Sequence, residues 1–188
     1  MFIGNEEKEK KKVLSNSLRL KLMPITFMIF IVTFIAGLYS PLSRDDAIAL
    51  AQGLNKYMDD IRNIPTFSGK TYYIFMHNAQ ICILMFFPIA GFFISLYSAY
   101  FSGLTLNSMH LLRNIGRLIL LRQMFLAPST WLEIFSYSMV MAESLFTGIG
   151  MILRKRTDFL YSFLILILSE SILLLSATIE VYYIIHVR

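Results

Sequence analysis

The longest uncharged stretch of this chain constrains its fold more than any other feature. Residues 72–109 are 38 residues without Asp, Glu, Lys or Arg. As one helix they would extend about 57 Å, whereas the hydrocarbon core of a bilayer is about 30 Å thick. Because Pro88 and Gly91 mark the midpoint, we expect two short helices that turn there, over 72–88 and 91–109.

Three further apolar blocks are long enough to cross a bilayer. They cover 22–40, 129–153 and 159–186, and a transmembrane helix needs about 20 residues. Only 15% of the residues are charged, compared with about 25% in an average soluble domain. The sequence therefore predicts an all-α, polytopic helical membrane bundle with about five membrane segments, within a range of four to six.

Two stretches read as amphipathic helices at the membrane interface, over 43–64 and 110–127. Ser43 and Asp46 have the spacing of a capping box, and apolar residues follow at helical intervals. In the second stretch, Arg113 and Arg117 are four residues apart, so we expect them to share one helix face as interfacial basic residues.

The basic residues bear on topology. We expect a charged tail at 1–21, followed by a single transmembrane domain at 22–188. Five crossings place the N-terminus and the basic run at 154–156 on the cytoplasmic side of the cell membrane, with the C-terminus outside. The distribution of basic residues slightly favours four crossings, whereas the length of the uncharged stretch favours five, which we adopt.

Polar residues inside the apolar blocks are the candidate functional residues. The last two blocks hold four glutamates: Glu133, Glu143, Glu170 and Glu180. No Lys or Arg lies within those blocks to pair with them. Such acids either form structural hydrogen bonds, here with serines, His77 or Asn78, or mark an ion or proton pathway.

Other motifs indicate packing rather than chemistry. Ser95, Ala99 and Gly103 are four residues apart and form a small-residue face for close helix packing. One cysteine and three widely spaced histidines do not suggest a metal site. We find no phosphate loop, nucleophile elbow or zinc-protease motif. We therefore expect no cofactor, no metal, no enzymatic activity and no nucleic-acid partner.

Three short motifs resemble the stage II sporulation protein M family of bacterial and archaeal membrane proteins. Residues 74–78 (Ile-Phe-Met-His-Asn) resemble the entry to its central spans. Residues 128–133 (Pro-Ser-Thr-Trp-Leu-Glu) are similar to its Pro-His-Gly-x-x-Glu motif, with Ser129 and Thr130 in place of His and Gly. Residues 177–180 (Ala-Thr-Ile-Glu) resemble its last, acidic span. The resemblance implies a membrane subunit without established enzymatic activity.

Two functions follow as expectations. The first is a non-enzymatic membrane scaffold or assembly subunit, with the lipid bilayer, further copies of the chain or other membrane and envelope proteins as partners. The alternative is a transporter or permease subunit for a proton, ion or small solute, working through the glutamates, with an ATPase as a further partner.

Overall fold

The computed structural model describes residues 14–186, and this range is all-helical, as the composition predicts. Seven helices follow one another along it: α2 (Asn16–Tyr39), α3 (Arg44–Asn63), α4 (Phe67–Met85), α5 (Ala90–Arg113), α6 (Arg117–Leu126), α7 (Pro128–Ile152) and α8 (Phe159–His186). The lysines of the predicted tail at 8, 10, 11 and 12 lie outside the described residues.

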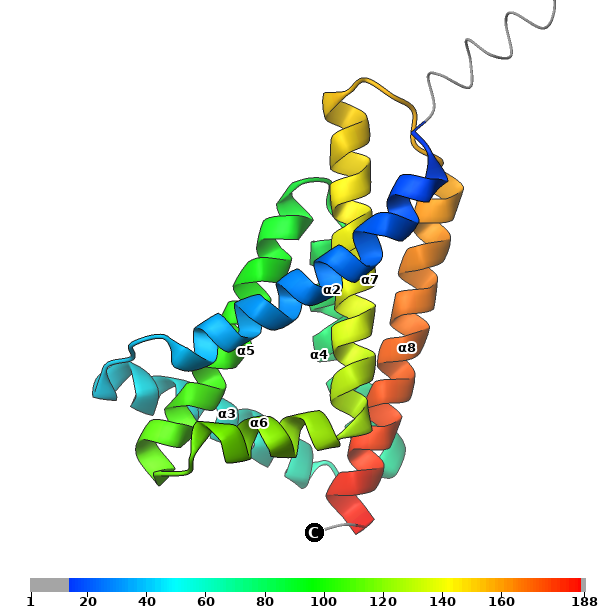
Figure 1. Cartoon of the computed structure of the whole chain (residues 1–188). Coiled ribbons are helices and arrows are strands. Elements are labelled where there is room, and N and C mark those ends of the chain that lie inside the picture. The colour runs from blue at the N-terminus through cyan, green and yellow to red at the C-terminus, as the bar shows by residue number, and fades with distance from the viewer. Residues whose placement is uncertain (1–13, 187–188) are drawn as a thin grey trace, which may run out of the picture.

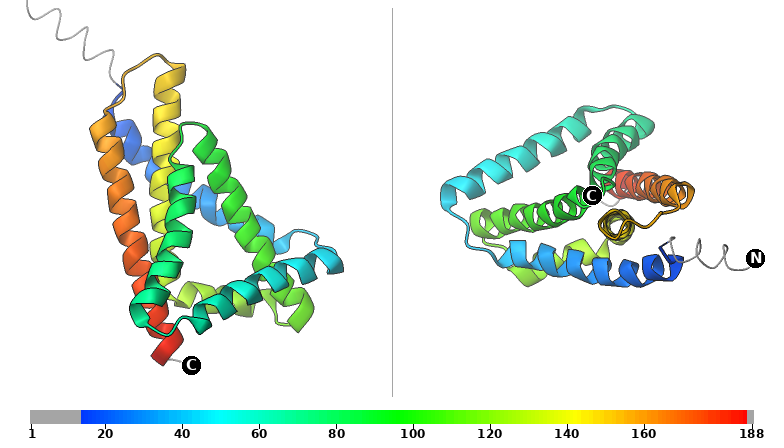
Figure 2. Two further views of the ribbon diagram at one scale, coloured as in Figure 1. Left: turned by 180° about the vertical axis from the view of Figure 1, so that it is seen from behind. Right: turned by 90° about the horizontal axis from the view of Figure 1, so that it is seen from above.

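The helices α4, α5, α7 and α8 run up and down, α2 crosses them obliquely, and α3 and α6 lie crosswise (Figure 1). One end, which we name the upper end as drawn, holds the start of α2, the α4–α5 turn and the α7–α8 loop. The lower end holds α3, α6 and the end of α8 (Figures 1 and 2). At the upper end the Leu14 amide donates to the Arg156 carbonyl, at 3.0 Å.

Two of the described helices, α2 and α8, are long and apolar enough to cross a membrane. A third crossing results if α6 and α7, which meet at 84°, count as one broken span. The predicted five crossings, the plasma membrane and the cytoplasmic N-terminus stay predictions.

The expected break in the long uncharged stretch lies between α4 and α5. Ile89 takes a φ of 64°, a conformation that is rare for a branched residue. Ser144 of α7 holds this turn, because its hydroxyl donates to the Phe87 carbonyl at 2.7 Å and accepts from the Phe92 amide at 3.0 Å. A Cβ at Gly91 would lie 1.8 Å from the Met85 carbonyl oxygen, so this position requires glycine.

The first amphipathic helix forms as predicted. The Ser43 hydroxyl accepts from the Asp46 amide and donates to its carboxylate, at 3.1 and 2.6 Å. Ala47 and Ile61 are buried on the inner face of α3. The Lys70 ammonium of α4 donates to the carbonyls at the C-terminal end of α3, which ties the two helices together.

The second amphipathic helix was wrongly predicted as one element. Asn114 takes a left-handed conformation, with φ 51°, and ends α5. The chain turns before α6 begins at Arg117. Arg113 and Arg117 therefore lie on different helices and do not share a face.

The first apolar helix begins earlier than predicted. The Ser15 hydroxyl accepts from the Ser17 amide and caps α2, so residues 16–21 belong to the helix and not to a tail. Pro24 consequently lies in the interior of α2, whereas a helix that began at residue 22 would have held it in its first turn. This shift brings Arg19 inside the bundle, where it is 4% exposed.

Close backbone contact joins α2 to α5. A Cβ on Gly37 would lie 2.1 Å from the Tyr100 carbonyl oxygen, and one on Gly103 would lie 2.1 Å from the Phe34 carbonyl oxygen. The structure buries the whole small-residue face of α5, with Ser95 and Ala99 beside Gly103. The helices approach this closely because no side chain separates them.

Candidate functional site

Hydrogen-bonded serines run along the contact between α7 and α8. Three buried pairs repeat every seven residues on each helix in antiparallel order: Ser162 with Glu143, Ser136 with Ser169, and Ser176 with Ser129. The Ser136 hydroxyl donates to the Ser169 carbonyl at 2.8 Å, and the Ser176 hydroxyl donates to the Ser129 carbonyl at 2.9 Å. This serine ladder connects two acidic centres, one toward each end of α7.

The upper acidic centre is a compensated ion pair between α2 and α7. Arg19 Nε lies 2.8 Å from Glu143 Oε2, and Arg19 Nη2 donates to Glu143 Oε1 at 2.9 Å. Glu143 is fully buried, and it also accepts from the Ser162 hydroxyl. The Arg19 guanidinium lies 4.2 Å from the centre of the Phe146 ring, so its charge is enclosed on several sides.

The lower acidic centre has only neutral hydrogen-bond donors. Glu133 of α7 accepts from the Asn78 amide of α4 at 3.3 Å and from the Ser176 hydroxyl of α8 at 3.1 Å. Glu180 of α8 lies within electrostatic range of Glu133. The salt bridges of residues 14–186 involve Glu143 and Asp59, and therefore neither of these two acids.

The lower centre also receives a tyrosine from α3. Burial raises the pKa of the Tyr57 phenol, and the neighbouring Glu180 and Glu133 raise it further. The phenol therefore keeps its proton and can donate a hydrogen bond toward the acids. Residues from α3, α4, α7 and α8 thus meet in this centre.

Glu170 stands apart from both centres. Its two carboxylate oxygens are buried and accept no hydrogen bond within the described structure. The Cys82 thiol of α4 lies beside it, close to the middle serine pair of the ladder. Glu170 is therefore a fourth glutamate on the α7–α8 side of the bundle, between the two centres along α8.

His77 lies at the edge of the lower centre rather than within it. Its ring is exposed and lies 5.0 Å, between ring centres, from the ring of Tyr57. The two rings line a cavity of about 430 Å³ between α3, α4 and α5. Asn78, the next residue along α4, points instead to Glu133.

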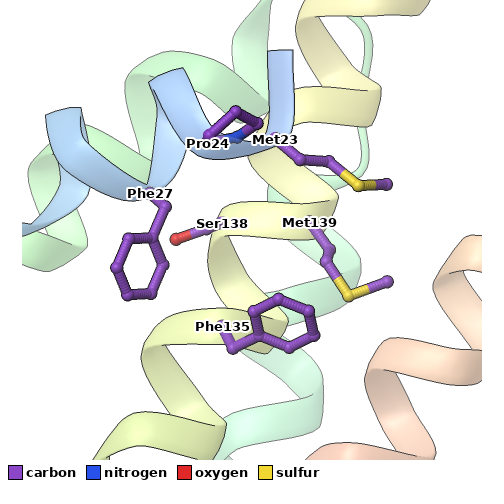
Figure 3. A pocket seen from close by; sticks show the side chains of 6 residues that line it. All are labelled: Met23, Pro24, Phe27, Phe135, Ser138 and Met139. Atoms are coloured by element: carbon purple, nitrogen blue, oxygen red, sulfur yellow. The ribbon is translucent and has the colours of Figure 1, made fainter. Parts of the chain in front are cut away.

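A second cavity, of about 340 Å³, lies between α2 and α7. Its lining comes from Met23, Pro24, Phe27, Phe135, Ser138 and Met139 (Figure 3). The only hydroxyl there, that of Ser138, donates to the Ile134 carbonyl of its own helix at 2.6 Å. This cavity offers no free polar group, so it contributes no chemistry to the site.

The two candidate interfacial arginines lie near the lower end. Arg117 Nε donates to the Asn107 side chain at 3.1 Å, and its guanidinium lies 5.3 Å from the centre of the Tyr39 ring. Arg113 is exposed at the end of α5. Across residues 14–186, no three His, Cys, Asp or Glu side chains are placed to hold a metal ion.

No protein-family model, curated protein or solved structure matches this chain. The resemblance to the stage II sporulation protein M family therefore stays a prediction. Sequence reasoning did place the four glutamates, His77 and Asn78 among the polar residues of interest. It missed Arg19, Tyr57 and the serine ladder, although the seven-residue spacing of the serines is visible in the sequence.

Proposed function

We propose that this chain is a non-enzymatic membrane subunit that binds a proton between Glu133 and Glu180 as a step in proton transport. One observation carries the proposal: two neighbouring carboxylates lie between helices with neutral donors only. Two negative charges without a cation are unfavourable in such a place, and a bound proton removes one of them. Acids inside a membrane bundle commonly mark proton relays.

The neighbours of the two acids support a site that binds and releases a proton. Asn78 and Ser176 donate to the same oxygen, Oε1 of Glu133. The other oxygen, Oε2, is left to carry or release a proton. Because the acids come from the adjacent helices α7 and α8, a small relative movement of these helices would alter the distance between the two carboxylates.

Proton flux into proteoliposomes tests this proposal. The purified chain is reconstituted with a pH-sensitive dye inside, and a potassium diffusion potential drives uptake. We expect flux in the natural chain and its loss in Glu133→Gln and in Glu180→Gln. Asp59→Asn, which removes an exposed acid of α3, is the matched control and should keep full flux. Unchanged flux in both glutamine variants would refute the proposal.

A second candidate, the membrane scaffold or assembly subunit, is favoured by an aromatic stripe on α5. Phe93, Tyr97 and Phe101 are 63%, 67% and 42% exposed at four-residue intervals. The rings of Tyr97 and Phe101 stack with centres 5.8 Å apart. Aromatic residues are enriched in protein interfaces, and a preformed stack loses little freedom on binding.

The oligomeric state in mild detergent tests this second candidate. We expect cross-linked oligomers from native membranes, reduced in a Phe93→Ala, Tyr97→Ala double variant. Phe163→Ala on the exposed face of α8 is the control and should leave the oligomers intact. A natural chain that remains monomeric after cross-linking would refute the scaffold.

A further inference from the structure

We infer that the 430 Å³ cavity between α3, α4 and α5 is a water-filled vestibule through which protons reach the Glu133–Glu180 pair, with Tyr57 and His77 as its floor. This inference rests on the proposed function and adds the route to the site. It also assigns a role to α3 as the outer wall of that route.

The lining of this cavity is largely apolar, with Leu50, Leu54 and Phe101 among its residues, but it also carries polar groups. His77, Ser102 and Thr105 bring an imidazole and two hydroxyl groups to its walls. The Thr105 hydroxyl already donates to the Phe101 carbonyl of its own helix, at 3.0 Å. A water molecule in a protein cavity needs about two to four polar partners, which the His77 imidazole, the Ser102 hydroxyl and the Tyr57 phenol supply. The cavity between α2 and α7, by contrast, offers no free hydrogen-bonding group.

The floor of the cavity is formed by residues that neighbour the acidic pair. Tyr57 lines the cavity, and its phenol lies within electrostatic range of Glu180 and Glu133. His77 also lines it, while the adjacent Asn78 donates to Glu133. The tilted Tyr57 and His77 rings, with centres 5.0 Å apart, therefore form the wall of the cavity on the side of the acidic pair.

The position of α3 gives the cavity an aqueous side. This helix lies crosswise at the lower end of the bundle (Figure 2), and its outward face holds exposed polar residues such as Asn55 and Lys56. Gly53 is exposed and lines the cavity, and a Cβ added to it would meet no atom within 4 Å. The cavity is therefore open beneath α3 rather than filled by it.

Cysteine labelling in membrane vesicles tests the vestibule without any transport assay. Cys82, the only natural cysteine, is buried and is first replaced in a Cys82→Ala background. Ser102→Cys then places a thiol in the cavity wall. We expect a charged, membrane-impermeant methanethiosulfonate reagent to label it when added to the side that α3 faces.

Two further cysteine variants serve as the positive and the negative control for labelling. Asn55→Cys lies on the polar face of α3 and should be labelled from the same side. Ser171→Cys lies on the exposed face of α8, which lipid covers, and should stay unlabelled because the reagent needs water and an ionised thiol. Labelling of Asn55→Cys without labelling of Ser102→Cys would overturn the vestibule.

Filling the cavity provides an independent check. Gly53→Trp, or the smaller Gly53→Leu if tryptophan prevents folding, should slow labelling of Ser102→Cys at least tenfold and leave Asn55→Cys unaffected. Equal labelling of Ser102→Cys with and without the filling residue would also overturn the vestibule.

The outcomes separate the vestibule from the proton-transport proposal. Labelling that Gly53→Trp blocks, without proton flux in the natural chain, supports the water-filled cavity and refutes only the transport. Flux without labelling of Ser102→Cys refutes the vestibule as the route and leaves the acidic pair as the transport site.

Discussion

The two acidic centres of this bundle use the same residue type and differ in what neutralises it. Glu143 at the upper centre faces the guanidinium of Arg19, at 2.8 and 2.9 Å. Glu133 at the lower centre faces an amide, a hydroxyl and a second acid. The upper charge is compensated within the fold, whereas the salt bridges of residues 14–186 involve neither acid of the lower pair.

This difference identifies Glu143 as the structural acid of the two centres. A buried ion pair is costly to form, because both groups lose their water, but removing one partner is costlier still. Glu143 is therefore fixed in its role once Arg19 is in place. The lower acids form no salt bridge within residues 14–186, and the proposed proton binding is therefore assigned to them.

The largest expected effect is at the upper centre. Arg19→Met leaves Glu143 buried without its cation and should lower the free energy of unfolding by about 3–5 kcal/mol. The measurement is denaturation of the purified chain in mixed detergent micelles, followed by circular dichroism.

The matched control removes both charges together. Arg19→Met combined with Glu143→Leu replaces the ion pair by apolar side chains, which is often neutral or stabilising. We expect this double variant to recover most of the lost stability. A double variant as unstable as Arg19→Met alone would show that shape, not charge, holds the upper centre.

Removing a charge from the lower centre should change the stability far less. Glu133→Gln keeps an oxygen that accepts from Asn78 and Ser176 and removes one of two neighbouring acids. We expect the free energy of unfolding to change by less than about 1 kcal/mol, since one neutral hydrogen bond in a membrane bundle contributes about 0.6 kcal/mol. The same denaturation experiment measures it. A loss as large as that of Arg19→Met would make Glu133 a structural residue.

The contrast between the centres could be predicted only in part from the sequence. The apolar blocks predict the helices, and Pro88 and Gly91 predict the central turn, because both signals are local in the sequence. Glu143 and its partner are 124 residues apart, and that pairing depends on how α2 crosses α7. Arg19 also looked like part of a basic tail, since a charged residue is rarely expected inside a span.

Two local features of the sequence do indicate the start of α2 and the contact between α7 and α8. Ser15 caps α2 and, read as a helix start, would have brought Arg19 into the first helix. The serines of α7 and α8, each seven residues apart, lie on one face of each helix and indicate that those faces meet. In contrast, the left-handed conformation of Asn114 could not be predicted with the same clarity. The only indication is that asparagine tolerates this conformation better than most residues.

The smallest expected effect lies between the two centres, at the middle of the serine ladder. Ser136→Ala removes one hydroxyl that donates to the Ser169 carbonyl at 2.8 Å, and it leaves the close helix approach intact. We expect a loss of about 0.6 kcal/mol, the average for such bonds between membrane helices. Ser171→Ala is the control, because its hydroxyl is exposed and bonds only within α8. If Ser136→Ala instead removes proton flux while stability changes this little, the ladder conducts between the centres, and the division between a structural upper end and a functional lower end no longer holds.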